Sequence, residues 1–148
     1  MVQPSPNPLA ALYETDETAW LETTAALVRA GRLGEVDTGN LAEYLSDMAW
    51  RDRREVVSRL VVLFVHLLKW DFQSQRRCGA WQATILEQQR ELRQLLESGT
   101  LLRHAQAVLP EAYAEARKQA AAETGLERQH FPAECPWSLE SSLEERAV

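Results

Sequence analysis

The chain has 148 residues, of which 45% are hydrophobic and 26% are charged, so it is long enough to bury a core as one domain and is not a disordered chain. With 22 acidic and 16 basic residues it carries a net charge of -6, which argues against a general binder of polyanions. Its two cysteines exclude a disulfide framework or a zinc ribbon, and we therefore expect a reduced, cytoplasmic setting.

The charge is unevenly distributed. Residues 51–103 contain ten basic and six acidic residues, whereas the remaining segments contain six basic and sixteen acidic residues. The basic middle either pairs with the acidic ends or forms a local patch for an anionic ligand. The longest nearly apolar run, residues 60–68, is far shorter than the roughly 20 residues that span a bilayer, so we expect no membrane segment.

The N-terminal part begins without the basic start and apolar stretch of a secretory signal. Its alternating prolines predict a frayed lead-in over residues 1–10. A first helix is predicted over 17–30, because Asp16 can cap its amides and Gly31 can end it. Two apolar faces are expected to point inward, on this helix and on the next: Trp20, Leu21, Ala25, Leu27 and Val28, then Leu41, Tyr44, Leu45, Met48 and Ala49.

The second helix should begin at Thr38. Asp52 followed by Glu55 has the form of a capping box, which predicts a break between Trp50 and Arg53. The alternative is one uninterrupted helix over residues 38–70, because no glycine or proline separates the two parts.

Residues 53–70 form the most apolar helix of the chain and are expected to lie at the centre of a bundle. The helix contains one ionisable ring, His66, which should be neutral or paired with a carboxylate if it is buried. Its apolar positions recur at steps of three and four: Val56, Val57, Leu60, Val61, Leu63, Phe64, Leu67 and Leu68.

Residues 71–79 are polar and predict a loop, which a helix over 81–97 follows. Another helical segment covers 101–123. Pro110 either ends or kinks a helix there, or begins a helix over 110–124.

The C-terminal segment, 126–148, is predicted as an extended tail that packs on the bundle and ends in a short helix capped by Ser138. No alternating strand pattern occurs. We therefore predict an all-α fold, in which residues 1–148 form a single-domain bundle of five to six helices with an irregular, proline-containing C-terminal segment.

Glu43 and Asp47 lie four residues apart, so both carboxylates project from one helix face. If that face meets His66 on a neighbouring helix, the three groups could form a proton-transfer or metal site. The alternative is a solvated acidic face and a core histidine. The familiar helical metal motifs are absent from the sequence, so we predict no metal and no cofactor and leave enzymatic activity open.

A second candidate site combines cations and large rings around the predicted loop. Stacked rings beside guanidinium groups can bind phosphates or single-stranded nucleic acid, but they also hold loops on cores. The lack of a phosphate loop, a zinc finger or a sustained basic helix disfavours nucleic acid. The candidates are Arg54, Trp70, Arg76, Arg77 and Trp81.

Several separate segments resemble, in order, a bacterial family, the domain-of-unknown-function family 29. The resemblance covers residues 12–143 and implies an all-helical, intracellular bacterial protein without an established activity. It also implies an acidic residue at the positions of Glu43 and Asp47. The segments that carry it are LYETDETAWLETTAALVRAGRLGEVDTGNLAEYL, HLLKWDFQ, RRCGAWQATILEQQREL, AAAETGL and FPAECPWSLE.

Five tryptophans and the lack of a specific catalytic motif favour a protein interaction module. We expect it to bind a partner protein or a second copy of itself through an apolar helix face, without contact with a membrane. The alternatives are a small hydrolase or metal-dependent enzyme built on the Glu/Asp/His cluster and, with weaker support, an anionic-ligand or nucleic-acid binder.

Overall fold

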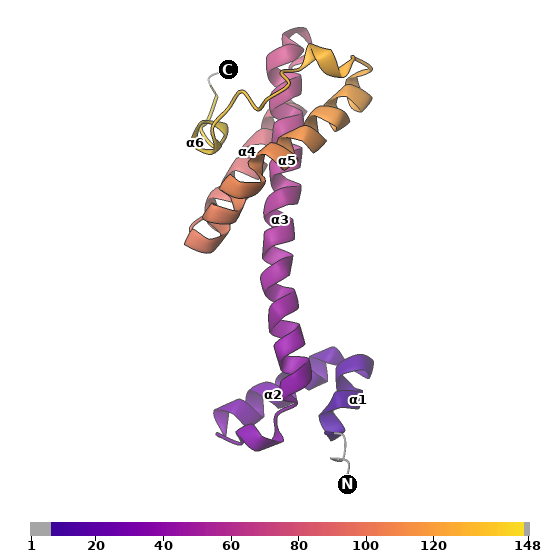
Figure 1. Cartoon of the computed structure of the whole chain (residues 1–148), viewed down its shortest axis with the longest axis vertical. Helices are drawn as coiled ribbons and strands as arrows, with labels where there is room; N and C mark the ends of the chain where they lie inside the picture. The colour runs from indigo at the N-terminus through magenta and orange to yellow at the C-terminus, as the bar shows by residue number, and fades with distance from the viewer. Residues whose placement is uncertain (1–6, 147–148) are drawn as a thin grey trace. The chain divides into compact units, whose positions relative to one another are not determined.

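The computed structural model describes residues 7–146, which contain six α-helices and no strand, so the predicted all-α class is confirmed. No helix in this described part is long and apolar enough to cross a membrane. The helices are labelled in Figure 1: α1 Pro8–Thr15, α2 Glu17–Arg29, α3 Thr38–Phe72, α4 Gly79–Leu95, α5 Gly99–Thr124 and α6 Leu139–Ser142.

The contacts divide the chain into two compact units, Met1–Trp50 and Arg51–Val148, here called the N-terminal and C-terminal units. Helix α3 begins in the first and continues into the second. That the whole chain forms a single domain stays a prediction.

The predicted frayed lead-in over residues 1–10 is wrong at its C-terminal end, where α1 begins. Positions 1–6 of that lead-in lie outside the described residues, but Pro8 to Ala10 are helical. The backbone N–H of Leu9 donates to Oδ1 of Asn7 at 2.9 Å, so Asn7 caps the helix. Pro8 occupies the first turn, where a missing N–H costs no helical hydrogen bond. Proline therefore begins a helix here.

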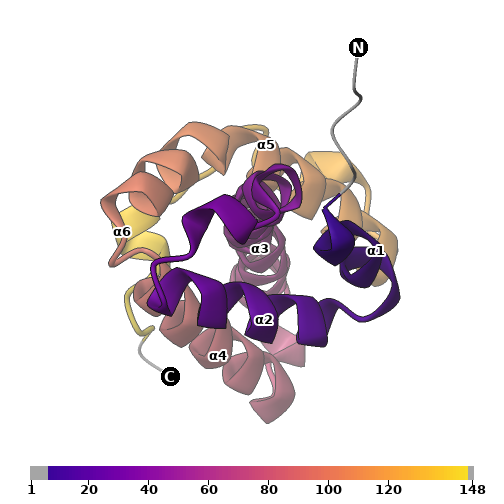
Figure 2. The same cartoon turned by 90° about the horizontal axis from the view of Figure 1, so that it is seen from below.

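Helices α1 and α2 and the first turns of α3 make up the N-terminal unit (Figure 2), which is built around the completely buried Trp20. The Tyr13 ring lies 4.7 Å from the Trp20 ring, and the Tyr44 ring lies 6.0 Å from it, measured between centroids. These three rings come from α1, α2 and α3. The predicted start and end of α2 are confirmed, since Asp16 caps it and Gly31 follows it with a φ of 72°.

Helix α3 is continuous from Thr38 to Phe72, so the predicted break is wrong and the uninterrupted alternative is right. The reason lies in Glu55. Instead of turning back to cap Asp52, its carboxylate accepts a hydrogen bond from Nε of Arg59, one turn later, at 2.9 Å. Such a pair supports a helix interior.

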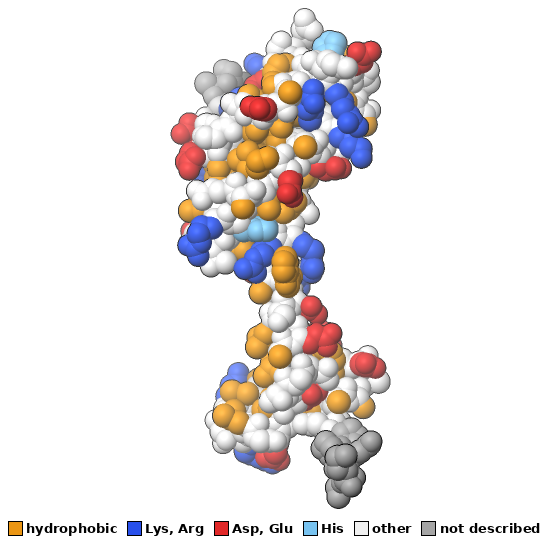
Figure 3. All heavy atoms as spheres, in the orientation of Figure 1, with side chains coloured by type: hydrophobic (Ala, Val, Ile, Leu, Met, Phe, Trp, Pro, Cys, Tyr) orange, Lys and Arg blue, Asp and Glu red, His pale blue; other side chains and the backbone are white. Residues whose placement is uncertain are grey.

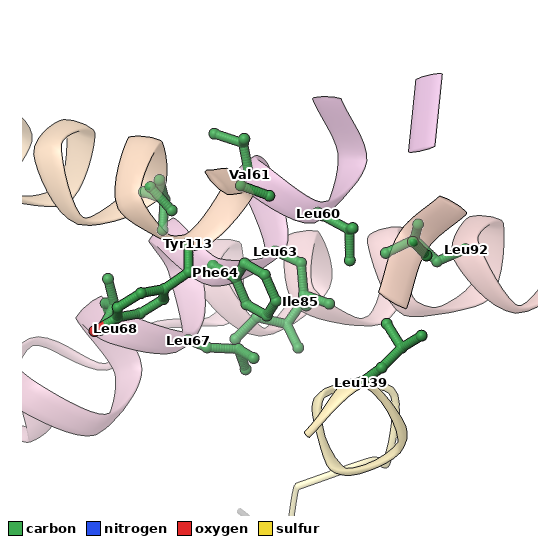
Figure 4. Close-up of a cluster of buried hydrophobic side chains, with 14 of the residues drawn as sticks. Leu60, Val61, Leu63, Phe64, Leu67, Leu68, Ile85, Leu92, Tyr113 and Leu139 are labelled. Carbon is green, nitrogen blue, oxygen red and sulfur yellow. The ribbon is translucent and has the colours of Figure 1, made fainter. Parts of the chain in front are cut away.

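The C-terminal unit packs α4, α5 and the tail around α3, as the helix pattern predicted (Figures 1 and 4). Leu60, Phe64 and Leu67 are fully buried. Helix α5 presents small side chains to this core, which allow a close approach between backbones. They are Ala105, Ala112, Ala116 and Ala120.

Several boundaries in this unit differ from the prediction, among them the start of α4 at Gly79, which we expected in the loop, and its end at Leu95. Helix α3 includes Asp71 and Phe72, which we expected in the loop, and a short 3-10 turn, Ser74–Arg76, follows. Pro110 lies inside α5 and neither ends nor begins it. Its ring faces solvent, where water can bond the carbonyl that loses its partner.

The tail is fastened by polar contacts. Ser138 caps α6, as predicted, by accepting from the backbone N–H of Ser141 at 3.0 Å. Gln89 of α4 is fully buried and donates from Nε2 to the carbonyl oxygens of Ser142, at 3.0 Å, and Glu144, at 2.8 Å. A buried amide thus holds the end of the chain against the core.

Candidate functional site

The three residues of the predicted polar cluster all lie on α3. Glu43 and Asp47 are exposed residues of the N-terminal unit, and His66 belongs to the C-terminal unit. The hypothesis assumed two neighbouring helices. Within one helix, side chains meet at spacings of three or four residues, so α3 itself does not join His66 to either carboxylate. Among the described residues no group of three histidine, cysteine or acidic side chains could hold a metal ion.

His66 instead bonds to its own helix. Its Nδ1 lies 2.8 Å from the carbonyl oxygen of Val62, which can only accept, so Nδ1 carries the hydrogen. Burial lowers the pKa of His66 below its ordinary value; the bond to Val62 opposes this shift, and the charge of Lys69 adds to it. The ring is therefore neutral near pH 7.

Three members of the cation and ring cluster, Trp70, Arg77 and Trp81, make contacts within the fold. Arg77 donates from Nε to the carbonyl oxygen of Trp70 at 2.8 Å, and its guanidinium lies 4.9 Å from the Trp70 ring centre. The Lys69 ammonium lies 4.9 Å from the Trp81 ring centre and 3.0 Å from Glu123. These contacts fasten the turn after α3.

Arg54 and Arg76, the other two basic candidates of that cluster, are exposed. Arg54 lies on α3 and Arg76 in the 3-10 turn that follows this helix. A shared anion site for these arginines stays a prediction.

The N-terminal unit carries a groove of about 370 Å³ between α2 and the first turns of α3. Apolar side chains at helical spacing form one stripe on each helix. We call this the α2/α3 groove. Its lining residues are Leu21, Thr24, Ala25, Val28 and Arg29 from α2, with Leu41, Tyr44 and Leu45 from α3.

Large apolar side chains in and beside this groove are open to solvent. Leu45 is 59% exposed and Val28 is 48% exposed, and Met48, one turn beyond Tyr44 on α3, is also exposed. Figure 3 shows hydrophobic side chains at the surface of this unit. Contiguous exposed apolar surface of this kind marks interaction sites in monomeric proteins.

The groove belongs to a strongly acidic unit. Residues 1–50 contain eight acidic and two basic residues. The pKa of Tyr13 is raised, first by burial of the phenol and then by the negative charges of Glu43, Asp47 and Glu17. The two carboxylates predicted as catalytic candidates therefore join Glu17 in an acidic cluster beside Tyr13.

Sequence reasoning missed the groove because it assigned every apolar position of these helices to the core. Trp20 is buried as expected, but Val28, Leu45 and Met48 are exposed. Periodicity finds a stripe, but it does not tell whether a neighbour covers it.

A protein-family model described as "Domain of unknown function DUF29" matches residues 12–147. Searches of curated proteins and of solved structures found no match.

Proposed function

The chain belongs to the family of the domain of unknown function DUF29, and we propose that it is a protein interaction module that binds its partner in the α2/α3 groove. The observation that carries the proposal is the exposure of Val28 and Leu45, which line the same groove from two helices. We assign the module to the cytoplasm of a bacterium. Free thiols at Cys78 and Cys135 support a reducing setting.

The physical driving force is the removal of apolar surface from water. Burying one exposed leucine or valine side chain contributes about 1.5–3 kcal/mol. Two parallel rows of apolar side chains are the usual receptor for the apolar face of an amphipathic helix, which inserts anchors at every third or fourth position. The groove offers such rows on α2 and α3.

A matched pair of substitutions tests this proposal. Leu45→Glu puts a charge in the groove, and Leu33→Glu puts the same charge on a leucine of the same unit that is 62% exposed and does not line the groove. The full chain and both variants are immobilised and incubated with bacterial lysate. Size-exclusion chromatography with light scattering reports the oligomeric state of each.

We expect the wild-type chain and Leu33→Glu to retain the same protein, and Leu45→Glu to lose it by at least about tenfold, because a carboxylate cannot enter an apolar contact without loss of affinity. Circular dichroism confirms that each variant is folded. A protein retained equally by all three chains would overturn the proposal, as would a wild-type chain that retains nothing.

A further inference from the structure

We infer that the occupant of the α2/α3 groove is a basic amphipathic helix of a partner protein. This inference rests on the proposed function and adds the chemistry of the partner. It follows from the shape of the groove and from the charge of the unit that carries it.

The groove has the dimensions of a short helix contact. Its lining on α2 runs from Leu21 to Arg29, which is about 12 Å along the helix axis at a rise of 1.5 Å per residue. Two turns of an incoming helix cover this length, with apolar anchors at positions i, i+3 or i+4, and i+7. An extended strand would find no sheet edge here, because the described residues contain no strand.

The surrounding charge selects the polar face of that helix. Glu17 begins α2 one turn before Leu21, on the same side of the helix, and Glu43 and Asp47 lie close enough to Tyr13 to raise its pKa. Lysine or arginine side chains flanking the apolar anchors would meet Glu17 beside the groove and the negative charge of the whole unit, which has eight acidic and two basic residues.

The two arginines of the unit do not offset the charge of its eight acidic residues. Arg32 is paired with Glu35 at 2.6 Å, which leaves Arg29 as the cation that lines the groove. Anionic lipid, nucleic acid and acidic peptides would all be repelled by the remaining carboxylates.

A second copy of the chain fits this surface less well. Self-association of identical patches would bring two units of net charge -6 against each other. Such like-charge juxtaposition opposes association.

A displayed library of helical peptides of about 16 residues, long enough for the two turns of contact, tests the inference. Leucines are fixed at the i, i+3, i+4 and i+7 positions, and the polar positions are randomised over all charged and neutral residues. The bait is the full chain, and counter-selection on Leu45→Glu removes peptides that bind elsewhere. The best peptide is then synthesised together with its charge-reversed form, in which every lysine and arginine is glutamate.

We expect the selected peptides to carry more lysine and arginine than aspartate and glutamate. In fluorescence anisotropy the basic form should bind at least about tenfold more tightly than the reversed form at low salt, and the difference should shrink at high salt. Replacing Glu17, Glu43 and Asp47 by their amides should reduce the preference, whereas Leu33→Glu should preserve it.

The outcomes separate the two proposals. Peptides that depend on Leu45 but are neutral or acidic would overturn the basic-helix inference and leave the groove function standing. No Leu45-dependent peptide, together with no Leu45-dependent protein from lysate, would overturn both. A wild-type dimer that Leu45→Glu dissociates would make a second copy the occupant and would overturn the inference about the partner.

Discussion

The indole N–H of Trp20 donates to Oδ2 of Asp37 at 3.3 Å, and both side chains are buried in the N-terminal unit. The same carboxylate oxygen accepts from Nδ2 of Asn40 at 2.7 Å, and Oδ1 accepts from the Asn40 backbone N–H at 3.5 Å. Asp37 therefore caps the start of α3 and links α2 to this helix through Trp20. The groove between the two helices depends on this hydrogen bond.

Asp37→Ala should destabilise the N-terminal unit by about 2–4 kcal/mol, since it removes a helix cap and leaves a buried indole N–H without an acceptor. Hydrogen exchange across α2 and the start of α3 measures the loss. The control is Asp16→Ala, which removes an exposed cap from α2 and should cost about 1 kcal/mol. Equal losses in the two variants would show that the Trp20 contact contributes nothing.

Gln89→Leu should loosen the end of the chain. The variant keeps an apolar side chain in the core but removes both hydrogen bonds to the carbonyl oxygens of Ser142 and Glu144, at a cost of about 1–3 kcal/mol. Hydrogen exchange over residues 138–146 should accelerate while that of α3 stays slow. Gln94→Leu, at an exposed position of α4, serves as the control. Unchanged protection of the tail in Gln89→Leu would contradict this account.

Tyr113 should make stability fall at high pH. Burial is the main cause that raises its pKa from 10.0 to about 12, and its hydroxyl donates to the carbonyl oxygen of Pro132 at 2.5 Å. The unfolded chain releases this proton at lower pH than the folded chain, so stability is complete below about pH 10 and declines as the pH rises toward 12. Tyrosinate absorbance should lose its latest-titrating component in Tyr113→Phe. A wild-type curve that overlays the variant curve would be inconsistent with this assignment.

His66 should make stability fall in mild acid. Its pKa is lowered in the folded chain, so the unfolded chain binds a proton first. Stability is then fully present above the ordinary pKa of 6.5 and decreases as the pH falls below it. Ring proton chemical shifts measured by nuclear magnetic resonance give the pKa directly, and His66→Leu should flatten the decline. A pKa above 6.5 would contradict the account in which burial keeps the His66 ring neutral.

Local signals predicted α2 well because its cap and its stop are residues with one strong local role. Asp16 caps and Gly31 adopts a positive φ, and neither depends on distant contacts. Glu55 is different, because a glutamate three residues after an aspartate can complete a capping box or pair with Arg59, and the structure shows the second arrangement. Pro8 was equally ambiguous, since proline both breaks helices and begins them.

The candidate site was harder to predict because it depends on tertiary contacts. The cluster of Glu43, Asp47 and His66 required a helix break that does not exist. To predict the apolar groove, one must know which apolar helix face has no other helix packed against it. The positions of Val28 and Leu45 in the sequence do not contain that information. What the sequence did predict was the apolar stripes on α2 and on the first turns of α3, and the acidic charge of the segments outside residues 51–103.

The fragment 51–148 should fold by itself. The hydrophobic cluster that contains Leu60, Phe64 and Tyr113 draws all its members from this part of the chain. Deleting residues 1–50 removes the first turns of α3 but no member of that cluster. We expect helical circular dichroism and a cooperative thermal transition from the fragment. A fragment without a cooperative transition would support the single-domain prediction, because folding of residues 51–148 would then require the N-terminal unit.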